Sequence, residues 1–386
     1  MMLESRSDKV FKVLHTDPRS FARRGQLNTA HGIVETPIFM PVGTQGTVKS
    51  VSPHELKDLE AQIILGNTYH LFVRPGLETI KKTGGLHSFM NWDLPILTDS
   101  GGFQVWSLAK MRKITEEGVH FQNHLDGSPT FIGPETSMEI QAGLGSDIAM
   151  LFDECPPYPC DEKYAERSGD LTLRWAARCK EWINNNKPVA GKTSHRQLHF
   201  GIVQGSIYSN LREQSAKGLV DLEFDGYAVG GVSVGEPEKE MIAAVDNSVP
   251  FLPKDKPRYA MGLGTPSQMI EMIARGIDMF DCVLPTRVAR TGTVYVSQGT
   301  LNLKNQKFAS DPSPIEEGCA CYSCRNGFSR AYIRHLIKSE EILGIRLTTL
   351  HNLYYYINLL ERTRNSLELG KFEELRKELQ ENSGKK

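Results

Sequence analysis

Three of the seven cysteines lie close together, in the pattern Cys-x-Cys-x-x-Cys at Cys319, Cys321 and Cys324. Three thiolates and one imidazole make a closed tetrahedral site of the structural zinc type, which leaves no position for a water nucleophile. Two downstream histidines are candidates for the fourth ligand. His335 lies in a basic stretch with helical spacing, whereas His351 follows that stretch and could fold back onto the cysteines. We favour His351 and expect one structural Zn²⁺ ion.

Two aspartates that end apolar runs have the chemistry needed to break a glycosidic bond. Asp99 precedes Ser-Gly-Gly, which is also typical of a turn or a helix cap. Asp281 lies among apolar residues, where an unpaired carboxylate is costly to bury, and an ion pair to Arg287 or Arg290 is the alternative to catalysis. If both carboxylates reach one cavity, one can attack the anomeric carbon and form a covalent sugar–enzyme intermediate. The other can move protons to and from the leaving and entering groups.

Asp153, Gln204 and Gly231 carry groups that match the edge of a guanine base. A carboxylate can accept hydrogen bonds from both the ring N–H and the exocyclic amine, and a glycine N–H can donate to the ring carbonyl. Each residue also has an ordinary structural explanation, because an aspartate can cap a helix and a glutamine can be satisfied within a loop. Taken one at a time, these residues leave both interpretations open.

Short apolar runs alternate with segments of helical spacing along most of the chain. The eight runs cover residues 38–44, 63–69, 95–101, 147–154, 199–205, 226–235, 257–264 and 276–282. Two of the helical segments begin with a capping box and a proline, at Ser52 and Thr265. Eight alternating strands favour a closed (β/α)₈ TIM barrel over a doubly wound open sheet, which is the alternative. Nearly every run ends in a polar or glycine-rich tip, and a barrel brings such tips together on one face.

Several segments depart from this alternation. Residues 10–36 turn at Arg24-Gly25 and predict an N-terminal hairpin that caps the barrel, and residues 104–133 predict a β-insertion. The charged stretch 361–379 predicts one weakly packed final helix. The expected domains are a catalytic barrel over 10–291, a zinc-binding subdomain over 292–350 and a C-terminal helical segment over 351–386 that packs on the barrel.

Composition and charge narrow the class of protein further. The 386 residues are 39% hydrophobic and 24% charged, as in an ordinary soluble protein. The formal net charge is −1, so nucleic-acid binding requires a local basic patch. No apolar run reaches the ~18 residues needed to span a bilayer, and the first residues lack the apolar core of a signal peptide. An odd cysteine count argues against a disulfide framework. We expect a cytoplasmic protein without membrane association.

Taken together, the motifs resemble those of the tRNA-guanine transglycosylase (queuine tRNA-ribosyltransferase) family, in its bacterial form. They are DSGGFQ, FDEC, GIVQG, YAVGGVSVGE, MGLGTP, FDCVLPTR, CxCxxC and TLHN, in the family's order over residues 10 to 370. The resemblance implies a barrel with a zinc subdomain, a homodimer, and base exchange in tRNA at wobble position 34 of the GUN anticodons. Those are the tRNAs for aspartate, asparagine, histidine and tyrosine. The incoming free base in bacterial members is 7-aminomethyl-7-deazaguanine, a precursor in queuosine biosynthesis.

The resemblance also implies roles for individual residues. Asp281 matches the nucleophile and Asp99 the general acid/base. The positions that match base contacts are Asp99, Ser100, Gly101, Gly102, Asp153, Gln204, Gly231 and Val232, with Phe103 and Met261 on the two faces of the ring. The positions that match RNA contacts are Gly262, Leu263, Gly264, Thr265, Pro266, Ser267, Gln268, Thr286, Arg287, Val288, Ala289 and Arg290. Phe328, Tyr332 and His335 match a dimer-interface stretch, which further favours His351 as the metal ligand.

Val234 and Cys155 bear on which deazaguanine is used. Eukaryotic members of the family take queuine, with its bulky cyclopentenediol, and have a glycine at the position of Val234 and a different residue at that of Cys155. The valine methyl groups fill space that the larger base needs, so we expect a preference for the small precursor. Two other functions are considered: a barrel hydrolase of glycosides or nucleosides, and a non-catalytic RNA-binding paralogue. The first leaves Thr286–Arg290 unexplained, and the second would be expected to lack the paired carboxylates, both of which are present.

Overall fold

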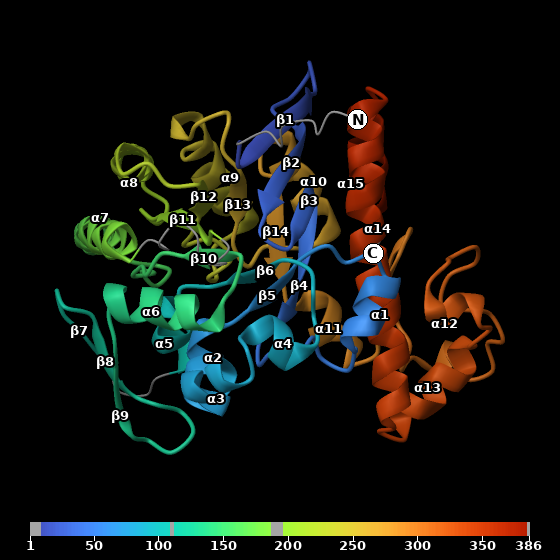
Figure 1. Ribbon diagram of the computed structural model, residues 1–386. Helices are drawn as coiled ribbons and strands as arrows, with labels where there is room; N and C mark the ends of the chain where they lie inside the picture. The colour runs from blue at the N-terminus through green and yellow to red at the C-terminus, as the bar shows by residue number, and fades with distance from the viewer. Residues whose placement is uncertain (1–8, 109–111, 187–195, 384–386) are drawn as a thin grey trace, which may run out of the picture.

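Eight parallel strands form a closed barrel in the computed structural model, which describes residues 9–108, 112–186 and 196–383 (Figure 1). The strands are β4 (Ile38–Gly43), β5 (Ile64–Gly66), β6 (Ile96–Thr98), β10 (Ile148–Met150), β11 (Leu198–Val203), β12 (Gly226–Val229), β13 (Arg258–Ala260) and β14 (Met279–Cys282). Pairing of β14 with β4 closes the barrel, with Phe280 opposite Phe39. Each of the eight apolar runs coincides with one of these strands, although β11 begins one residue before its run. The predicted (β/α)₈ barrel is therefore confirmed, and the open sheet is excluded.

Helices surround the barrel between successive strands (Figure 1). They are α1 (Pro53–Asp58), α2 (Thr68–Leu71), a π-helical turn (Phe72–Gly76), α3 (Leu77–Lys82), α4 (Leu86–Met90), α5 (Gly102–Leu108), α6 (Pro134–Leu144), α7 (Glu162–Asn185), α8 (Ser209–Asp221), α9 (Glu238–Asp246), α10 (Pro266–Ala274) and α11 (Leu284–Ala289). Ser52 and Thr265 begin α1 and α10 with complete capping boxes, as predicted. None of the helices in the described part of the chain has the length and apolar character needed to cross a membrane.

An antiparallel sheet of three strands covers the end of the barrel where its strands begin. The strands are β1 (Phe11–Thr16), β2 (Arg23–Thr29) and β3 (Gly32–Thr36). Arg23 of this sheet donates a 2.8 Å hydrogen bond to Asp278, the residue before β14. The predicted turn at Arg24-Gly25 is wrong, because both residues lie within β2 and pair with β1. A side chain at Gly25 would come within 2.6 Å of the Phe11 ring, so this glycine provides packing space, not a turn.

The predicted insertion is a second antiparallel sheet beside the barrel. It contains β7 (Arg112–Ile114), β8 (Val119–Gln122) and β9 (Pro129–Ile132), and α5 occupies the first part of the predicted range. Alternate residues of β8 are buried, with Val119 and Phe121 packed in the same hydrophobic cluster as Trp175 of α7. The insertion therefore buries one face against the barrel's outer helices.

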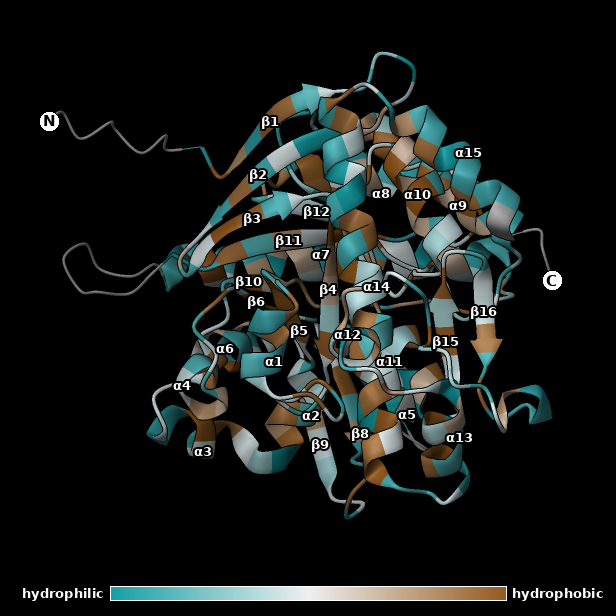
Figure 2. Ribbon diagram, turned by 90° about the vertical axis from the view of Figure 1, so that its right-hand side faces the viewer, coloured by the Kyte–Doolittle hydropathy of each residue, from teal (hydrophilic) through white to brown (hydrophobic). Residues whose placement is uncertain are grey.

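The C-terminal part consists of a hairpin and four helices. They are β15 (Thr293–Val296), β16 (Gly299–Asn302), α12 (Tyr322–Arg325), α13 (Arg330–Lys338), α14 (Ile342–Glu368) and α15 (Phe372–Ser383). The expected boundary between residues 350 and 351 falls inside α14, a single helix of 27 residues. The stretch 361–379 forms no single weakly packed helix, since it belongs to both α14 and α15. Figure 2 shows hydrophobic and hydrophilic residues on α15, and its Phe372 is fully buried.

Candidate active site and metal centre

A cavity of ≈ 510 Å³ opens at the carboxyl ends of the barrel strands. Residues at or just after the ends of all eight strands line it. The predicted site residues among them are Asp99, Ser100, Phe103, Asp153, Gln204, Gly231, Val232, Met261, Gly262, Gly264, Gln268, Asp281 and Arg287. The face of the barrel that gathers these side chains is the one on which TIM-barrel enzymes build their active sites.

Asp99 follows β6 and is almost completely buried. The Asn67 amide donates a hydrogen bond to its Oδ2, and the Thr68 N–H donates one of 2.8 Å to its Oδ1. Burial raises the pKa of Asp99 to about 7 and the nearby Asp281 carboxylate adds to this, while the bonds from Asn67 and Thr68 oppose it. Both protonation states are therefore populated near neutral pH, as a general acid/base requires.

Asp281 lies in β14, and two donors converge on one of its oxygens. The Tyr259 hydroxyl donates a 2.5 Å hydrogen bond to Oδ1, and the Gly262 N–H donates one of 2.6 Å to the same atom. Burial raises the pKa of Asp281, and these two bonds oppose the rise by stabilising the carboxylate. Within the described residues, Asp281 makes no ion pair with Arg287 or Arg290, so the structural alternative to a catalytic role loses its basis.

Asp153 and Gln204 are held together at the bottom of the cavity. The Ser100 hydroxyl donates 2.7 Å to Asp153 Oδ1, and Gln204 Nε2 donates 2.7 Å to Asp153 Oδ2. Burial raises the pKa of Asp153, against the effect of both bonds. Gln204 Oε1 is buried and has no hydrogen-bond partner in the described part of the chain. A buried acceptor without a partner is costly, so this oxygen is suited to a donor on a bound ligand.

Two glycines of the predicted site are required by close backbone approach. A Cβ on Gly102 would come within 2.5 Å of the Asp153 carbonyl oxygen. Gly231 has φ = +61°, and a Cβ there would come within 2.6 Å of Gln204 Oε1. The Gly-Gly pairs of both motifs thus let the loops after the strands pack tightly around the cavity.

The residues of the two stretches matched to RNA contacts, 262–268 and 286–290, differ in solvent exposure. Gly262, Arg287 and Arg290 are exposed beside the cavity, while the segment 265–268 is partly buried and begins α10. The side chains of Leu263, Thr286 and Ala289 are buried and pack inside the protein. Only part of each stretch is therefore available to a ligand, and the two arginines supply its positive charge.

The predicted metal ligands come together in space. Cys319, Cys321 and Cys324 place their sulfur atoms 3.8, 3.4 and 3.6 Å from Nδ1 of His351. Metal–ligand bonds of about 2.3 Å to sulfur and 2.0 Å to nitrogen produce separations of this size in a tetrahedral site. His351 Nε2 lies 2.6 Å from the Tyr295 carbonyl oxygen, which fixes that nitrogen as the donor and leaves Nδ1 for a metal.

The position of His351 differs from the expectation that it follows a helix and folds back. It lies within α14, where its Nε2 contacts the Tyr295 carbonyl of β15, and α12 brings Cys321 at its N-cap and Cys324 to it. His335 is exposed on α13 and is not part of the cluster. The preference for His351 is confirmed, and the four ligand atoms could hold one metal ion.

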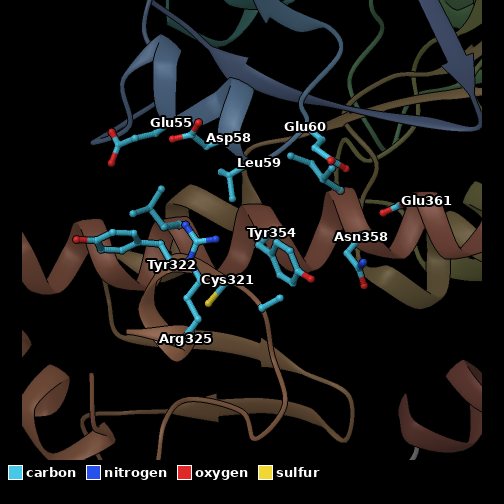
Figure 3. A pocket seen from close by; sticks show the side chains of 13 residues that line it. Glu55, Asp58, Leu59, Glu60, Cys321, Tyr322, Arg325, Tyr354, Asn358 and Glu361 are labelled. Atoms are coloured by element: carbon cyan, nitrogen blue, oxygen red, sulfur yellow. The ribbon is translucent and has the colours of Figure 1, made fainter. Parts of the chain in front are cut away.

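A second, smaller cavity of ≈ 260 Å³ lies beside the metal centre (Figure 3). Glu55 and Asp58 of α1, with Glu60 just after it, face Tyr322 and Arg325 of α12 across this space. Its remaining wall is α14, and none of the carboxylates that line the strand-end cavity belongs to it. This cavity is separate from the candidate active site.

Comparison with known proteins identifies the family. A family model described as queuine tRNA-ribosyltransferase matches residues 17–385. The chain belongs to this family. It is 55% identical over 368 residues to the queuine tRNA-ribosyltransferase of Caldanaerobacter subterraneus subsp. tengcongensis, covering 95% of this chain and 96% of the relative. It is 54% identical over 367 residues to that of Symbiobacterium thermophilum, with 95% and 90% covered. With that of Staphylococcus aureus (strain N315) it shares 55% identity over 374 residues, with 97% and 96% covered.

Membership of the queuine tRNA-ribosyltransferase family confirms both the resemblance and the expectation of a transferase. Sequence reasoning nevertheless missed three residues around the cavity. Asn67 was noticed only as the polar tip of a run, yet it binds Asp99. Tyr259 lies in an apolar run with nothing to distinguish it from a core residue, and Arg212 lies in a helical segment whose register alone does not show that it is buried.

Proposed function

We propose that this queuine tRNA-ribosyltransferase family member exchanges guanine at wobble position 34 of GUN tRNAs for free 7-aminomethyl-7-deazaguanine. The observation that carries the proposal is one cavity that holds two carboxylates, the buried Asp99 and the half-buried Asp281, in different hydrogen-bond environments. The same cavity holds the guanine-matching groups of Asp153, Gln204 and Gly231. Two carboxylates of distinct character beside a base-recognition site are what a double displacement at a nucleoside requires.

In the first half of the reaction, Asp281 displaces guanine. Tyr259 and Gly262 bind Oδ1, so Oδ2 is the oxygen that we assign as the nucleophile. It forms a bond to C1′ of the ribose while the bond from C1′ to N9 of guanine breaks. The electron pair of that bond leaves with the base, and protonated Asp99 donates a proton to it. The ribose is then held on the enzyme as an ester of Asp281.

In the second half, the incoming deazaguanine occupies the position that guanine left. Asp99, now ionised, takes the proton from N9 of the new base, and N9 attacks C1′. The bond from C1′ to Asp281 breaks, and its electron pair returns to the carboxylate. Because Asp99 has a pKa of about 7, the same group can serve as acid and as base.

Selectivity for guanine-like bases is assigned to the floor of the cavity. The Asp153 carboxylate, held by Ser100 and Gln204, can accept from the ring N–H and the exocyclic amine. Gln204 Oε1 has no partner within the described structure and is available to a further donor of the base. The Gly231 N–H can donate to the ring carbonyl. No other common base presents this combination.

Preference for the aminomethyl base is assigned to the loop after β12. Val234 and Cys155 line the cavity and limit its size. The N–H groups of Ser233 and Val234 both donate to the Glu236 carboxylate, the second at 2.8 Å. Since C=O and N–H point in opposite directions across a peptide, the bond from Ser233 turns the Val232 carbonyl away from Glu236. That carbonyl, which belongs to a cavity-lining residue, is suited to accept from an aminomethyl ammonium.

The exposed arginines of α11 and the residue after it are consistent with tRNA as the partner. Arg287 is exposed and lines the cavity, and Arg290 is exposed at the end of the same helix, α11. Guanidinium groups there can pair with the phosphates of an anticodon loop, which the net charge of −1 does not attract by itself. Anticodon-loop bases are unpaired, so turning one into the cavity costs less than it would in a duplex. We place the reaction in the cytoplasm, where tRNA is found.

We propose that the metal is Zn²⁺ and that its role is structural. Three thiolates and an imidazole fill all four positions of a tetrahedral ion, which leaves none for a substrate. The ion would tie α12 to α14 and thereby stabilise the subdomain over 292–350, beside a barrel over 10–291. A homodimer is proposed from an aromatic surface cluster: the half-buried Phe328 ring stacks on the exposed Tyr332 ring at 6.1 Å between centroids, and His335 is exposed one helical turn from Tyr332.

Incorporation of labelled guanine into unmodified GUN tRNA tests the proposed function. The expected result is label in RNA with wild-type protein and none with a tRNA whose wobble base is not guanine. Release of free guanine without incorporation would instead indicate a hydrolase. Binding of tRNA without release or incorporation would indicate a non-catalytic paralogue. Either of those two results refutes the proposal.

A further inference from the structure

Arg212 of α8 is completely buried, yet its guanidinium contacts only backbone oxygens. It donates four hydrogen bonds, one to each of four carbonyl groups. Nε donates 2.7 Å to Ser206, Nη1 donates 2.7 Å to Gly230 and 3.2 Å to Val203, and Nη2 donates 3.3 Å to Gly231. In the described residues no carboxylate forms an ion pair with it. A buried cation without a counter-charge is costly, so this arrangement calls for a purpose beyond packing.

All four carbonyls belong to the two segments that carry base-recognition groups. Val203 ends β11 and Ser206 lies in the loop after it, on either side of Gln204, and Gly230 and Gly231 begin the loop after β12. Ser206 has φ = +52°, an unfavourable backbone conformation for serine. The bond from Arg212 Nε to the Ser206 carbonyl stabilises the loop in that shape. One side chain therefore ties together the two loops behind the floor of the cavity.

The hydrogen bond from Arg212 to the Gly230 carbonyl also determines the direction of the Gly231 N–H, because both groups belong to the same peptide. A trans peptide is planar, and its C=O and N–H bonds point in opposite directions. The Gly230 carbonyl points at Arg212, so the Gly231 N–H of the same peptide points away from it. That N–H faces the sulfur of Cys155, which is itself a cavity-lining residue. Gly231 has φ = +61°, where glycine adopts several conformations readily, so without the guanidinium this peptide could rotate.

We propose that Arg212 is a positioning residue for base specificity: it fixes the Gly231 N–H toward the carbonyl of the bound base. This inference rests on the proposed base exchange and deepens it. Arg212 touches no substrate and acts only through the Gly230–Gly231 peptide. Replacing Arg212 lowers the affinity for bases that carry the ring carbonyl more than the affinity for bases that lack it. A guanidinium is needed because its planar fork reaches carbonyls on both loops at once, and a lysine ammonium does not.

The test compares two bases in Arg212→Lys and in wild type. One is labelled guanine, whose KM is measured by incorporation into tRNA. The other is 2-aminopurine, which keeps the exocyclic amine but lacks the ring carbonyl and its adjacent N–H, and whose Ki is measured by competition. For Arg212→Lys, we expect the guanine KM to rise about tenfold, the worth of one hydrogen bond. The 2-aminopurine Ki should change by less than about threefold, with the tRNA KM unchanged.

Arg258→Lys is the matched control, because Arg258 is another buried arginine that donates to carbonyls, those of Leu252 and Pro253. Arg258 lies in β13 and makes these contacts away from the cavity. Arg258→Lys should therefore leave the ratio of the guanine KM to the 2-aminopurine Ki as it is in wild type. KM and Ki do not depend on the fraction of enzyme that is folded, so the comparison stands even where the variant is less stable. Equal weakening of both bases, or of neither, overturns the role of Arg212. Failure of wild type to incorporate guanine would instead overturn the proposed function itself.

Discussion

The Asp99→Asn variant tests whether the surroundings of Asp99 raise its pKa to a value near 7. The pKa of Asp99 is raised from 3.8 to about 7, so between these values the folded state binds more protons than the unfolded state. Folding stability therefore falls as the pH rises through this window, and it levels off above pH 7. An asparagine has nearly the same shape and does not titrate, so the variant should lack this part of the pH dependence.

The magnitude follows from the width of the window. The part of this window between pH 5.5 and pH 7 spans about 1.5 pH units. Each unit corresponds to about 1.4 kcal/mol of unfolding free energy. Wild type should thus lose about 2 kcal/mol of unfolding free energy relative to Asp99→Asn between pH 5.5 and pH 8. Groups that do not interact with Asp99 contribute equally to both proteins, so their contribution cancels in the difference. The exchange of the hydrogen bonds from Asn67 and Thr68 adds an offset that is the same at every pH.

Urea unfolding of both proteins at pH 5.5, 6.5, 7.5 and 8 measures the difference. A parallel assay of base exchange should show a loss of about 10²- to 10⁴-fold in kcat for the variant, the usual contribution of a general acid/base. A flat difference across the whole range would mean that Asp99 ionises at its ordinary pKa. The assignment of Asp99 as the proton carrier would then have to be abandoned, whatever the activity of the variant.

Three further outcomes are expected. Asp281→Asn should remove the RNA–protein adduct that wild type forms on a denaturing gel with tRNA and a competing base, because an amide is no nucleophile; an adduct in the variant would point to a different carboxylate. Cys321→Ser should lower bound zinc and melting temperature together, and metal-free protein with unchanged melting and tRNA binding would contradict a structural metal. Val234→Gly should narrow the preference for 7-aminomethyl-7-deazaguanine over queuine, a preference worth roughly 1–3 kcal/mol in a packed site. Equal inhibition of wild type by the two bases would argue against the bacterial substrate.

The barrel could be predicted from the sequence because its signal is local and repeated. Each strand is a short, mostly apolar run that the structure buries almost entirely, as it does Ile64–Gly66 in β5, and nearly every run ends in a polar or glycine-rich tip. The turn at Arg24-Gly25 was predicted from the same kind of local signal and is wrong. Glycine marks either a turn or a close contact, and only the position of Phe11 across the sheet distinguishes them.

The residues that support the site could not be predicted, because their effect depends on contacts between distant segments. Tyr259 and Asp281 are 22 positions apart and meet because β13 and β14 are neighbours in the barrel. Asn67 and Asp99 meet because β5 and β6 are neighbours. Asn67 directly follows β5, where a polar side chain is equally consistent with a loop residue, whereas Tyr259 lies inside β13 and is equally consistent with a core residue.

Those supporting residues give the three aspartates of the cavity three different surroundings, which fit the three roles that we propose for them. Burial raises the pKa of Asp99, Asp153 and Asp281 alike, so burial alone does not distinguish them. Their hydrogen-bond donors do. Asp153 is bound on both oxygens by side chains and is held in place, whereas Asp281 is bound on one oxygen by Tyr259 and Gly262, which favours its anionic form. Asp99 lies near the charge of Asp281 as well, which adds to the effect of burial and raises the pKa of Asp99 to about 7. We therefore expect the proposed role of each carboxylate to depend on the residues that bind it. Replacing one of these neighbours should alter one role and leave the other two intact.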